Sequence, residues 1–212
     1  MIIDNFNLLK DHLIFNNKDE FYFVQIIQRK KDGNDNLHVR SGYRLIRSYY
    51  IYSVEELSSL EVRIKELCVT NNARAYISMN VRNAKEVALE CIKRYTDLVL
   101  NNNAFQGNNI WDSVCGGSRA RGYKALWVVD IDRPDIADQI EEFIRSCRHN
   151  EDFTLYRVPT VHGFHIICNG FDTNQFNSML KDKQLDLIDV HKNNPTLLYY
   201  NDLFSEQKQT II

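Results

Sequence analysis

The chain has 212 residues, of which 44% are hydrophobic and 25% are charged, and its formal net charge is -2. This composition excludes a disordered chain and is that of a globular protein with one large domain or two lobes that share a core. The net charge also excludes a protein that coats nucleic acid through bulk positive charge, although it permits a local basic groove.

The N-terminus and the cysteines favour a cytoplasmic protein. The first residues include an acidic side chain, Asp4, and lack the basic region and cleavage site of a signal peptide. No apolar run is long enough to span a bilayer, so we expect no membrane segment. The five cysteines are widely spaced without a C-x-x-C pair, which favours reduced thiols over a disulfide framework or a zinc site.

The first half of the chain predicts a small αβ lobe. Ser53 and Glu56 form a capping box, and Asn83 resembles a second helix cap. The elements expected before residue 101 are a helix at 4–15, strands at 21–28, 43–52 and 74–79, and helices that begin after the two caps. Residues at helical spacing predict a buried stripe on the later helix: Val87, Cys91, Ile92, Tyr95, Leu98 and Val99.

The second half predicts strands that alternate with helices. A polar loop at 101–121 leads to an apolar strand, and Pro134 suits the first turn of the helix that follows. The later expected elements are a strand with His165, a helix at 174–180, and strands at 187–190 and 197–200. We therefore expect an N-terminal αβ lobe at 1–121 and a second lobe at 122–212, packed as one compact unit.

Two carboxylates, Asp130 and Asp132, close the apolar run 126–132. Side chains on alternate strand positions point the same way, so these two are expected to lie side by side. Carboxylates placed in this way repel each other unless a divalent cation lies between them. The pattern therefore indicates a site for Mg²⁺ or Mn²⁺, the ions that assist phosphoryl and nucleotidyl transfer. A D-x-D at a strand end is also typical of a carboxylate that caps the next helix.

A second motif places a glycine two residues before a histidine. Gly163 permits close approach of the backbone, and His165 leads into the apolar run 166–168. A histidine in this place could donate a hydrogen bond to a phosphate oxygen. The alternative is a core histidine that is satisfied by a backbone carbonyl.

A third motif places an acid after a hydrophobic pair. Asp189 could complete the metal site, with Lys192 near bound phosphates. Asp186 competes with Asp189 as the third carboxylate. Either acid could instead be an ordinary solvated residue at a strand end.

The order of these motifs resembles the archaeo-eukaryotic primase superfamily, which includes the primase-polymerases of phages and plasmids. D-x-D, G-x-His and hydrophobic-Asp follow one another with helices between them. The resemblance covers residues 127–200, and its specificity lies in the order and strand placement of short motifs. It implies an α/β fold with an RRM-like catalytic sheet and packed helices, preceded by the smaller αβ lobe.

The resemblance also implies a role for each matching residue. Asp130, Asp132 and Asp189 would hold two Mg²⁺ or Mn²⁺ ions, and His165 would contact the triphosphate. The family's frequent serine two places before the histidine is a glycine here. The further candidates for nucleotide binding are Gly163, Arg157 and Lys192.

We therefore expect template-directed nucleotidyl transfer by a primase or primase-polymerase in phage or mobile-element replication. Its partners would be a single-stranded DNA template, nucleoside triphosphates and a separate helicase. Two other functions stay open: a metal-dependent nuclease or replication-initiation protein, and a catalytically silent nucleic-acid-binding module.

Three other patterns have simpler explanations. Residues 30–33 match K-x-D-G, the covalent-lysine motif of nucleic-acid ligases, but Asp-Gly between strands is also a hairpin signal. The glycine-rich segment 116–121 could cradle a phosphate or form a surface loop. Basic residues alternate with tyrosines over 40–52, as in proteins that bind single strands and as on any half-exposed strand.

Overall fold

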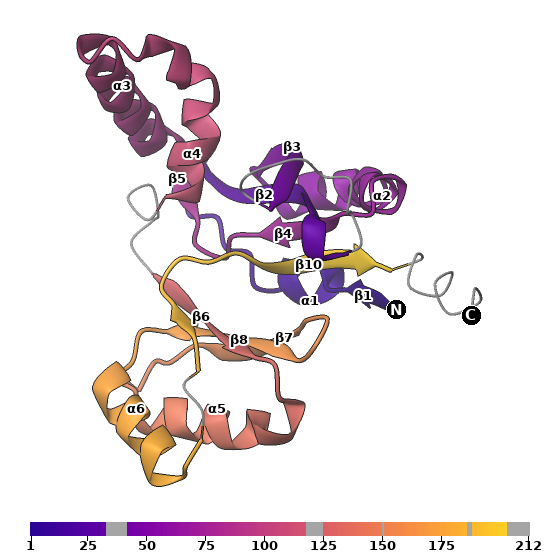
Figure 1. Cartoon of the computed structure of the whole chain (residues 1–212), viewed down its shortest axis with the longest axis vertical. Coiled ribbons are helices and arrows are strands. Elements are labelled where there is room, and N and C mark those ends of the chain that lie inside the picture. The colour runs from indigo at the N-terminus through magenta and orange to yellow at the C-terminus, as the bar shows by residue number, and fades with distance from the viewer. Residues whose placement is uncertain (33–41, 118–124, 150, 186–187, 203–212) are drawn as a thin grey trace. The chain divides into compact units, whose positions relative to one another are not determined.

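The computed structural model describes residues 1–32, 42–117, 125–149, 151–185 and 188–202 (Figure 1). These residues form a mixed α/β protein with antiparallel sheets and six α-helices. The chain divides into two units, one of Met1–Tyr123 with Leu197–Ile212 and one of Lys124–Thr196. A search of the described helices finds none with the length and hydropathy needed to cross a bilayer.

The first unit contains a sheet with the strand order β1-β10-β4-β2-β3, in which β5 also pairs with β2. Strand β2 pairs in antiparallel fashion with β3, β4 and β5, and β1 pairs in the same way with β10. Strand β3 therefore lies at one edge of the sheet. The strands are β1 (Ile2–Asp4), β2 (Glu20–Arg29), β3 (Tyr43–Ile51), β4 (Arg74–Ile77), β5 (Arg82–Asn83) and β10 (Thr196–Asn201).

Both predicted helix caps of this unit are confirmed. The Ser53 hydroxyl accepts a hydrogen bond from the Glu56 N–H, and the Asn83 carboxamide accepts from two N–H groups of the first turn. Each cap satisfies amide groups that have no partner within the helix. The helical segments are α1 (Phe6–Lys10), α2 (Val54–Thr70), α3 (Ala84–Leu100) and α4 (Ile110–Gly116), with short 3-10 turns η1 (Lys30–Asp32) and η2 (Ala104–Asn109).

Two expectations for this unit are only partly met. The helix expected at 4–15 is present but shorter, since α1 covers Phe6–Lys10, and Asp4 is the last residue of β1, which pairs with β10. The buried stripe of α3 is narrower than its spacing suggests: Val87 and Cys91 are buried, whereas Ile92 and Val99 are 63% and 49% exposed. Helix α3 carries apolar residues on more than one face, and its buried residues Val87 and Cys91 belong to the cluster that contains Phe21.

The second unit contains a four-stranded sheet with the order β7-β8-β6-β9. All three neighbouring pairs are antiparallel. Helices α5 and α6 lie on one side of this sheet (Figure 1). In chain order the elements are β6 (Leu126–Ile131), η4 (Pro134–Ile136), α5 (Ala137–Ser146), β7 (Leu155–Pro159), β8 (Phe164–Asn169), α6 (Thr173–Asp182) and β9 (Val190–His191).

Strand alternation gives this sheet two chemically different faces. Val129 and Ile131 of β6 and Ile166 and Cys168 of β8 belong to the core that includes residues of α5 and α6. The side chains between them, including Asp130 and its cross-strand neighbour, point to the opposite face. The apolar face therefore anchors the strands from which the predicted site residues project.

The strand content and boundaries of this unit differ from the expected ones. Residues 155–159 form β7, which pairs with β8 through a tight hairpin and was not expected. Residues 197–200, expected in the second lobe, belong to β10 and to the sheet of the first unit. An apolar run such as Leu197–Tyr200 predicts a buried strand, but it carries no local information about which sheet the strand joins.

Candidate functional site

Three of the predicted site residues lie on the same face of the second sheet, on two neighbouring strands and directly before a third. Asp130 of β6 pairs with His165 of β8. On its other side, the Asp130 N–H donates to the carbonyl oxygen of Asp189 at 3.0 Å, which extends the β6–β9 register by one position. Because directly paired residues point the same way, Asp130, His165 and Asp189 share the face away from α5 and α6.

The three predicted carboxylates line one cavity of about 190 Å³. Asp132 and Asp189 are exposed, and the side chain of Asp130 is 39% exposed. Asp186, the alternative third carboxylate, lies outside the described residues. The residues that line the cavity are Asp130, Ile131, Asp132, Arg133, Ile136, Ile188 and Asp189.

His165 lies beside this cavity and is held from two sides. Its Nε2 atom is 3.4 Å from Oδ1 of Asp130, and its Nδ1 atom is 2.9 Å from the hydroxyl oxygen of Thr196. The His165 side chain is 14% exposed and Thr196 is fully buried. Thr196 is a residue of the site that sequence analysis missed, since nothing local to a threonine 31 residues away indicates this contact.

The charges around His165 favour one tautomer of its ring. A carboxylate oxygen beside Nε2 favours a proton on that nitrogen, because two lone pairs would repel. The buried Thr196 hydroxyl then donates to Nδ1, which satisfies both groups. In this arrangement His165 presents an N–H at the edge of the acidic cavity.

Gly163 has a structural role that the sequence indicated only in part. A Cβ atom at this position would lie 1.9 Å from the carbonyl oxygen of Ile131 and 3.2 Å from the Cα atom of Asp132. The close backbone approach expected for Gly163 is therefore made to the D-x-D strand itself. Two hydrogen bonds between Gly163 and Thr160 close this turn. The Gly163 N–H donates to the Thr160 hydroxyl at 3.2 Å, and the Gly163 carbonyl accepts from the Thr160 N–H at 2.9 Å.

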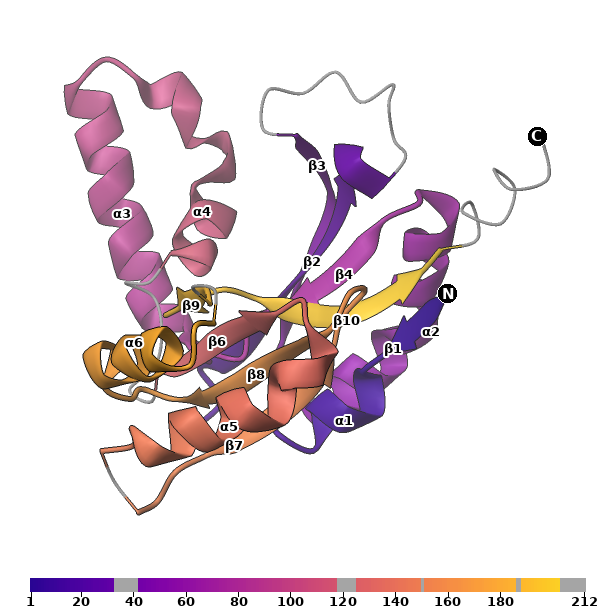
Figure 2. The ribbon, with the colours of Figure 1, turned by 60° about the horizontal axis from the view of Figure 1, so that its bottom comes forward.

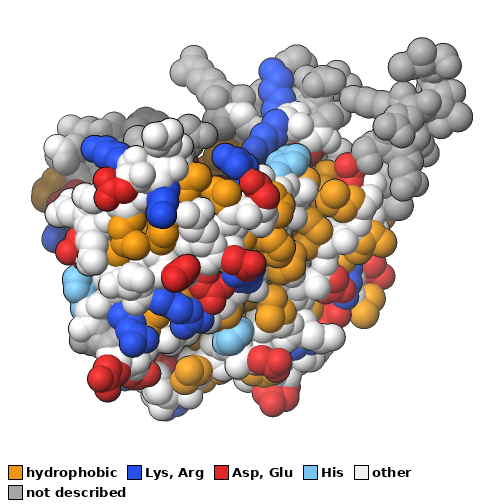
Figure 3. Space-filling model, turned by 90° about the horizontal axis from the view of Figure 1, so that it is seen from below, with side chains coloured by type: hydrophobic (Ala, Val, Ile, Leu, Met, Phe, Trp, Pro, Cys, Tyr) orange, Lys and Arg blue, Asp and Glu red, His pale blue; other side chains and the backbone are white. Residues whose placement is uncertain are grey.

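Arg157 and Lys192, two of the predicted nucleotide-binding residues, project toward the other face. Arg157 donates to Glu141 at 2.8 Å and to Asp138 at 2.6 Å, both on α5. Lys192 has its ammonium group 5.0 Å from the ring centroid of Trp127, whose side chain packs against the core. On the face of the molecule shown in Figure 3, acidic and basic side chains are likewise interspersed. Neither cation lines the acidic cavity.

The donor atoms at the cavity suit hard divalent cations. Mg²⁺ and Mn²⁺ prefer oxygen ligands, and three carboxylates border one cavity. Within the described part of the chain, however, no three acidic, histidine or cysteine side chains form a group ready to hold a metal ion. Asp130, Asp132 and Asp189 therefore border one cavity without forming such a group in this structure.

The K-x-D-G segment contains a buried ion pair. Asp32 accepts two hydrogen bonds from the Arg74 guanidinium, at 2.7 and 2.5 Å, and its side chain is 2% exposed. Asp32 therefore joins the end of β2 to β4. Gly33 and residues 118–121 of the glycine-rich segment lie outside the described residues.

Comparison of the chain with protein-family models, with curated proteins and with solved structures found no match.

Proposed function

We propose that the second unit carries out metal-dependent, template-directed nucleotidyl transfer of the primase or primase-polymerase type. The observation that supports this proposal most directly is the cavity bordered by Asp130, Asp132 and Asp189. Asp130 lies in β6, Asp132 directly follows that strand and Asp189 directly precedes β9, so the fold brings distant parts of the sequence to one site. His165 stands beside them with an N–H donor.

The topology of the unit also supports the proposal. Its chain order is strand, helix, strand, strand, helix, strand, and its first and third strands, β6 and β8, are adjacent in the sheet. This is the connectivity of a split βαβ or RRM-like sheet. The D-x-D and the histidine lie on the two adjacent strands, as the resemblance to the primase superfamily implies.

Each residue has a defined task in this proposal. Asp130, Asp132 and Asp189 would hold divalent ions, which when bound would lower the pKa of the attacking hydroxyl and stabilise the charge of the departing pyrophosphate. The Nε2–H group of His165 donates a hydrogen bond to a phosphate oxygen of the incoming nucleotide. Thr196 holds the ring through Nδ1 and accommodates the tautomer that Asp130 favours, with the proton on Nε2. Gly163 keeps the turn before His165 against the D-x-D strand.

The test is nucleotide incorporation on a single-stranded template, primed and unprimed, with Mg²⁺ or Mn²⁺. We expect product from the wild type and at least about a hundredfold less from Asp130→Asn/Asp132→Asn, because the lost carboxylates act at the transition state. The matched control is Asp152→Asn/Asp182→Asn, which removes two exposed acids of the same unit outside the cavity. This control should retain wild-type activity.

A second readout separates metal binding from catalysis. Mn²⁺ should raise the melting temperature of the wild type and of the control, because an ion that binds only the folded state stabilises it. The Asp130→Asn/Asp132→Asn variant should melt at or above the metal-free wild-type temperature and should not respond to Mn²⁺. Cleavage of DNA without nucleotides would instead identify a nuclease. Absence of incorporation, cleavage and metal response would leave a silent binding module.

A further inference from the structure

We propose that the outer end of the β2–β3 hairpin is a binding surface for single-stranded nucleic acid. We call this surface the hairpin arm and define it by the described residues 29–31 and 43–49. As the place for a template strand it rests on the proposed function, but its binding can be measured without metal or nucleotide. Strands β2 and β3 extend beyond the adjoining part of the first unit's sheet (Figure 2).

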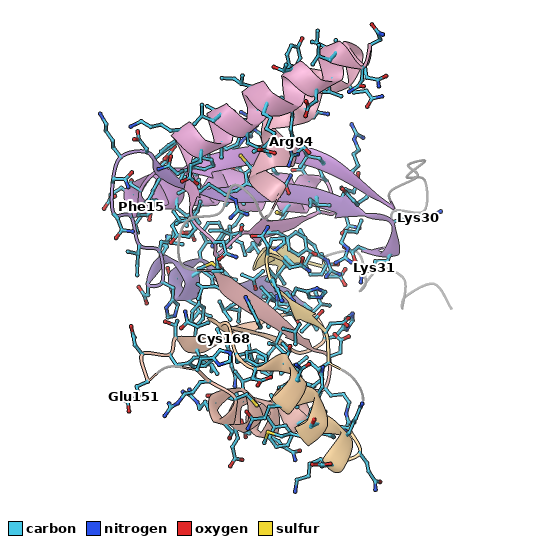
Figure 4. The ribbon with its side chains drawn as sticks, turned by 90° about the vertical axis from the view of Figure 1, so that its left-hand side faces the viewer. Phe15, Lys30, Lys31, Arg94, Glu151 and Cys168 are labelled. Carbon is cyan, nitrogen blue, oxygen red and sulfur yellow. The ribbon has the colours of Figure 1, made fainter. Side chains whose placement is uncertain are left out.

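The hairpin arm concentrates positive charge on a chain whose net charge is -2. Lys30, Lys31, Arg44 and Arg47 are all exposed. Lys30 and Lys31 lie at the end of β2 (Figure 4). None of the ion pairs among the described residues includes any of these four cations. The nearby acid, Asp32, is occupied by Arg74.

A register shift puts the two arginines on one face of the edge strand. Arg44 and Arg47 are three residues apart and would point to opposite faces of a regular strand. Arg47 pairs with Ile26, but the next residue, Ile27, pairs with Leu45, so one residue of β3 is left out of the register. This irregularity acts as a β-bulge and brings Arg44 and Arg47 to the same face.

An aromatic side chain continues this basic row. Tyr49 pairs with Val24 and therefore points to the same face as Arg47. The Arg47 guanidinium carbon lies 5.4 Å from the centroid of the Tyr49 ring. A strip of cations that contact phosphates, next to a ring on which a base can stack, is the combination that binds single strands without sequence preference. A duplex keeps its bases stacked inside and would use only the cations.

The experiment measures binding of a fluorescein-labelled oligothymidylate of about 20 nucleotides, longer than the site of a small single-strand-binding fold. Metal and nucleotide are absent from this assay. We expect the variant Lys30→Gln/Lys31→Gln/Arg44→Gln/Arg47→Gln to bind at least about tenfold more weakly than the wild type. In a plot of log affinity against log salt concentration, the slope for this variant should be shallower by about 3. Each phosphate contact to a single strand contributes about 0.7 to this slope, and the variant removes four cations.

The matched control removes four exposed lysines elsewhere: Lys18→Gln/Lys93→Gln/Lys181→Gln/Lys183→Gln. It has the same net charge as the hairpin variant and should bind like the wild type. Equal weakening in both variants would overturn the proposal, because bulk charge would then explain the binding. Tyr49→Leu should weaken binding to the oligothymidylate about fivefold or more while leaving duplex binding unchanged.

A second experiment asks whether the hairpin arm binds nucleic acid or an anionic lipid surface. Wild-type protein that binds vesicles of phosphatidylserine and phosphatidylcholine but not the oligothymidylate would overturn the proposal. Loss of oligothymidylate binding in the hairpin variant, with nucleotide incorporation absent even in the wild type, would support the hairpin arm and reject the catalytic proposal. The two proposals can therefore fail separately.

Discussion

His165 and Asp130 face each other across β8 and β6, with the imidazole Nε2 3.4 Å from the carboxylate Oδ1. Cross-strand pairing fixes this relationship, because the two residues are partners in an antiparallel register. A third residue, the buried Thr196, holds the other side of the ring through Nδ1, while the proton that Asp130 favours stays on Nε2. The chemistry available at the cavity thus depends on a hydroxyl that does not line it.

Replacing Thr196 tests this dependence. Thr196→Val keeps the shape of the side chain but removes the hydroxyl, so Nδ1 of His165 loses its partner. We expect a stability loss of about 1–3 kcal/mol, the cost of an unsatisfied buried polar group. The ¹⁵N chemical shifts of the His165 ring should show the tautomer ratio changing in this variant. Thr196→Ser should restore both properties, and a Thr196→Val ring with wild-type shifts would rule out the positioning role.

Gly163 should tolerate no larger residue. The Cβ atom of Gly163→Ala would meet backbone rather than a movable side chain, 1.9 Å from the Ile131 carbonyl oxygen. We expect a destabilisation of about 1–3 kcal/mol, as for an overpacked core, together with loss of incorporation. Gly116→Ala is the control, since nothing lies within 4 Å of its added Cβ atom. Chemical denaturation of both variants would show the contrast, and equal stabilities would contradict it.

Arg157 should matter for stability at neutral pH but not for activity. Burial alone would raise the pKa of Glu141, but hydrogen bonds from Arg145 and Arg157 outweigh it and lower this pKa. A carboxyl with a lowered pKa in the folded state stabilises above its unfolded pKa, and this stability disappears as the pH falls through the folded value. Arg157→Met should therefore cost about 1 kcal/mol or less at pH 7.

The stability difference between this variant and the wild type should become smaller at acidic pH, as Glu141 takes up a proton. Urea unfolding at neutral and at acidic pH measures the difference. Nucleotide incorporation should be unchanged by Arg157→Met, since Arg157 pairs with α5 on the other face of the sheet. A large loss of incorporation in a stable Arg157→Met protein would show that our assignment of this face is wrong.

The Asp32–Arg74 pair should be a main support of the first unit. Asp32→Asn leaves the Arg74 guanidinium, whose side chain is 10% exposed, without its anionic partner. Breaking a buried ion pair in this way costs about 3–5 kcal/mol. Lys30→Met, which changes the exposed lysine of the K-x-D-G segment, should melt like the wild type. A ligase mechanism would instead make Lys30 the essential residue, and Lys30 would form a covalent adduct when the protein is incubated with ATP.

Local signals in the sequence account for much of the fold. Ser53 and Asn83 mark helix starts that the structure contains, and the apolar runs before Asp130 and after His165 are strands. These signals succeed because capping and side-chain alternation act over a few residues. Pairings between distant segments have no such signature, which explains why the pairing of β1 with β10 was not expected.

The candidate site was predictable to a similar extent. Alternation places Asp130 on a strand face, and the order of motifs brings His165 and Asp189 near it. Two other contacts depend on tertiary packing alone: Gly163 lies against Ile131, and Thr196 contacts His165. The direction of Arg157 toward α5 depends on which strand position falls next to that helix, and the sequence contains no marker for that register.

The position of β10 between β1 and β4 has a consequence for synthesis on the ribosome. Lys124–Thr196 is translated completely before the strand that completes the sheet of the first unit emerges. Until Leu197 and the residues after it leave the exit tunnel, β1 has no β10 to pair with. The sheet of the first unit is therefore completed only after the whole of the second unit has been translated.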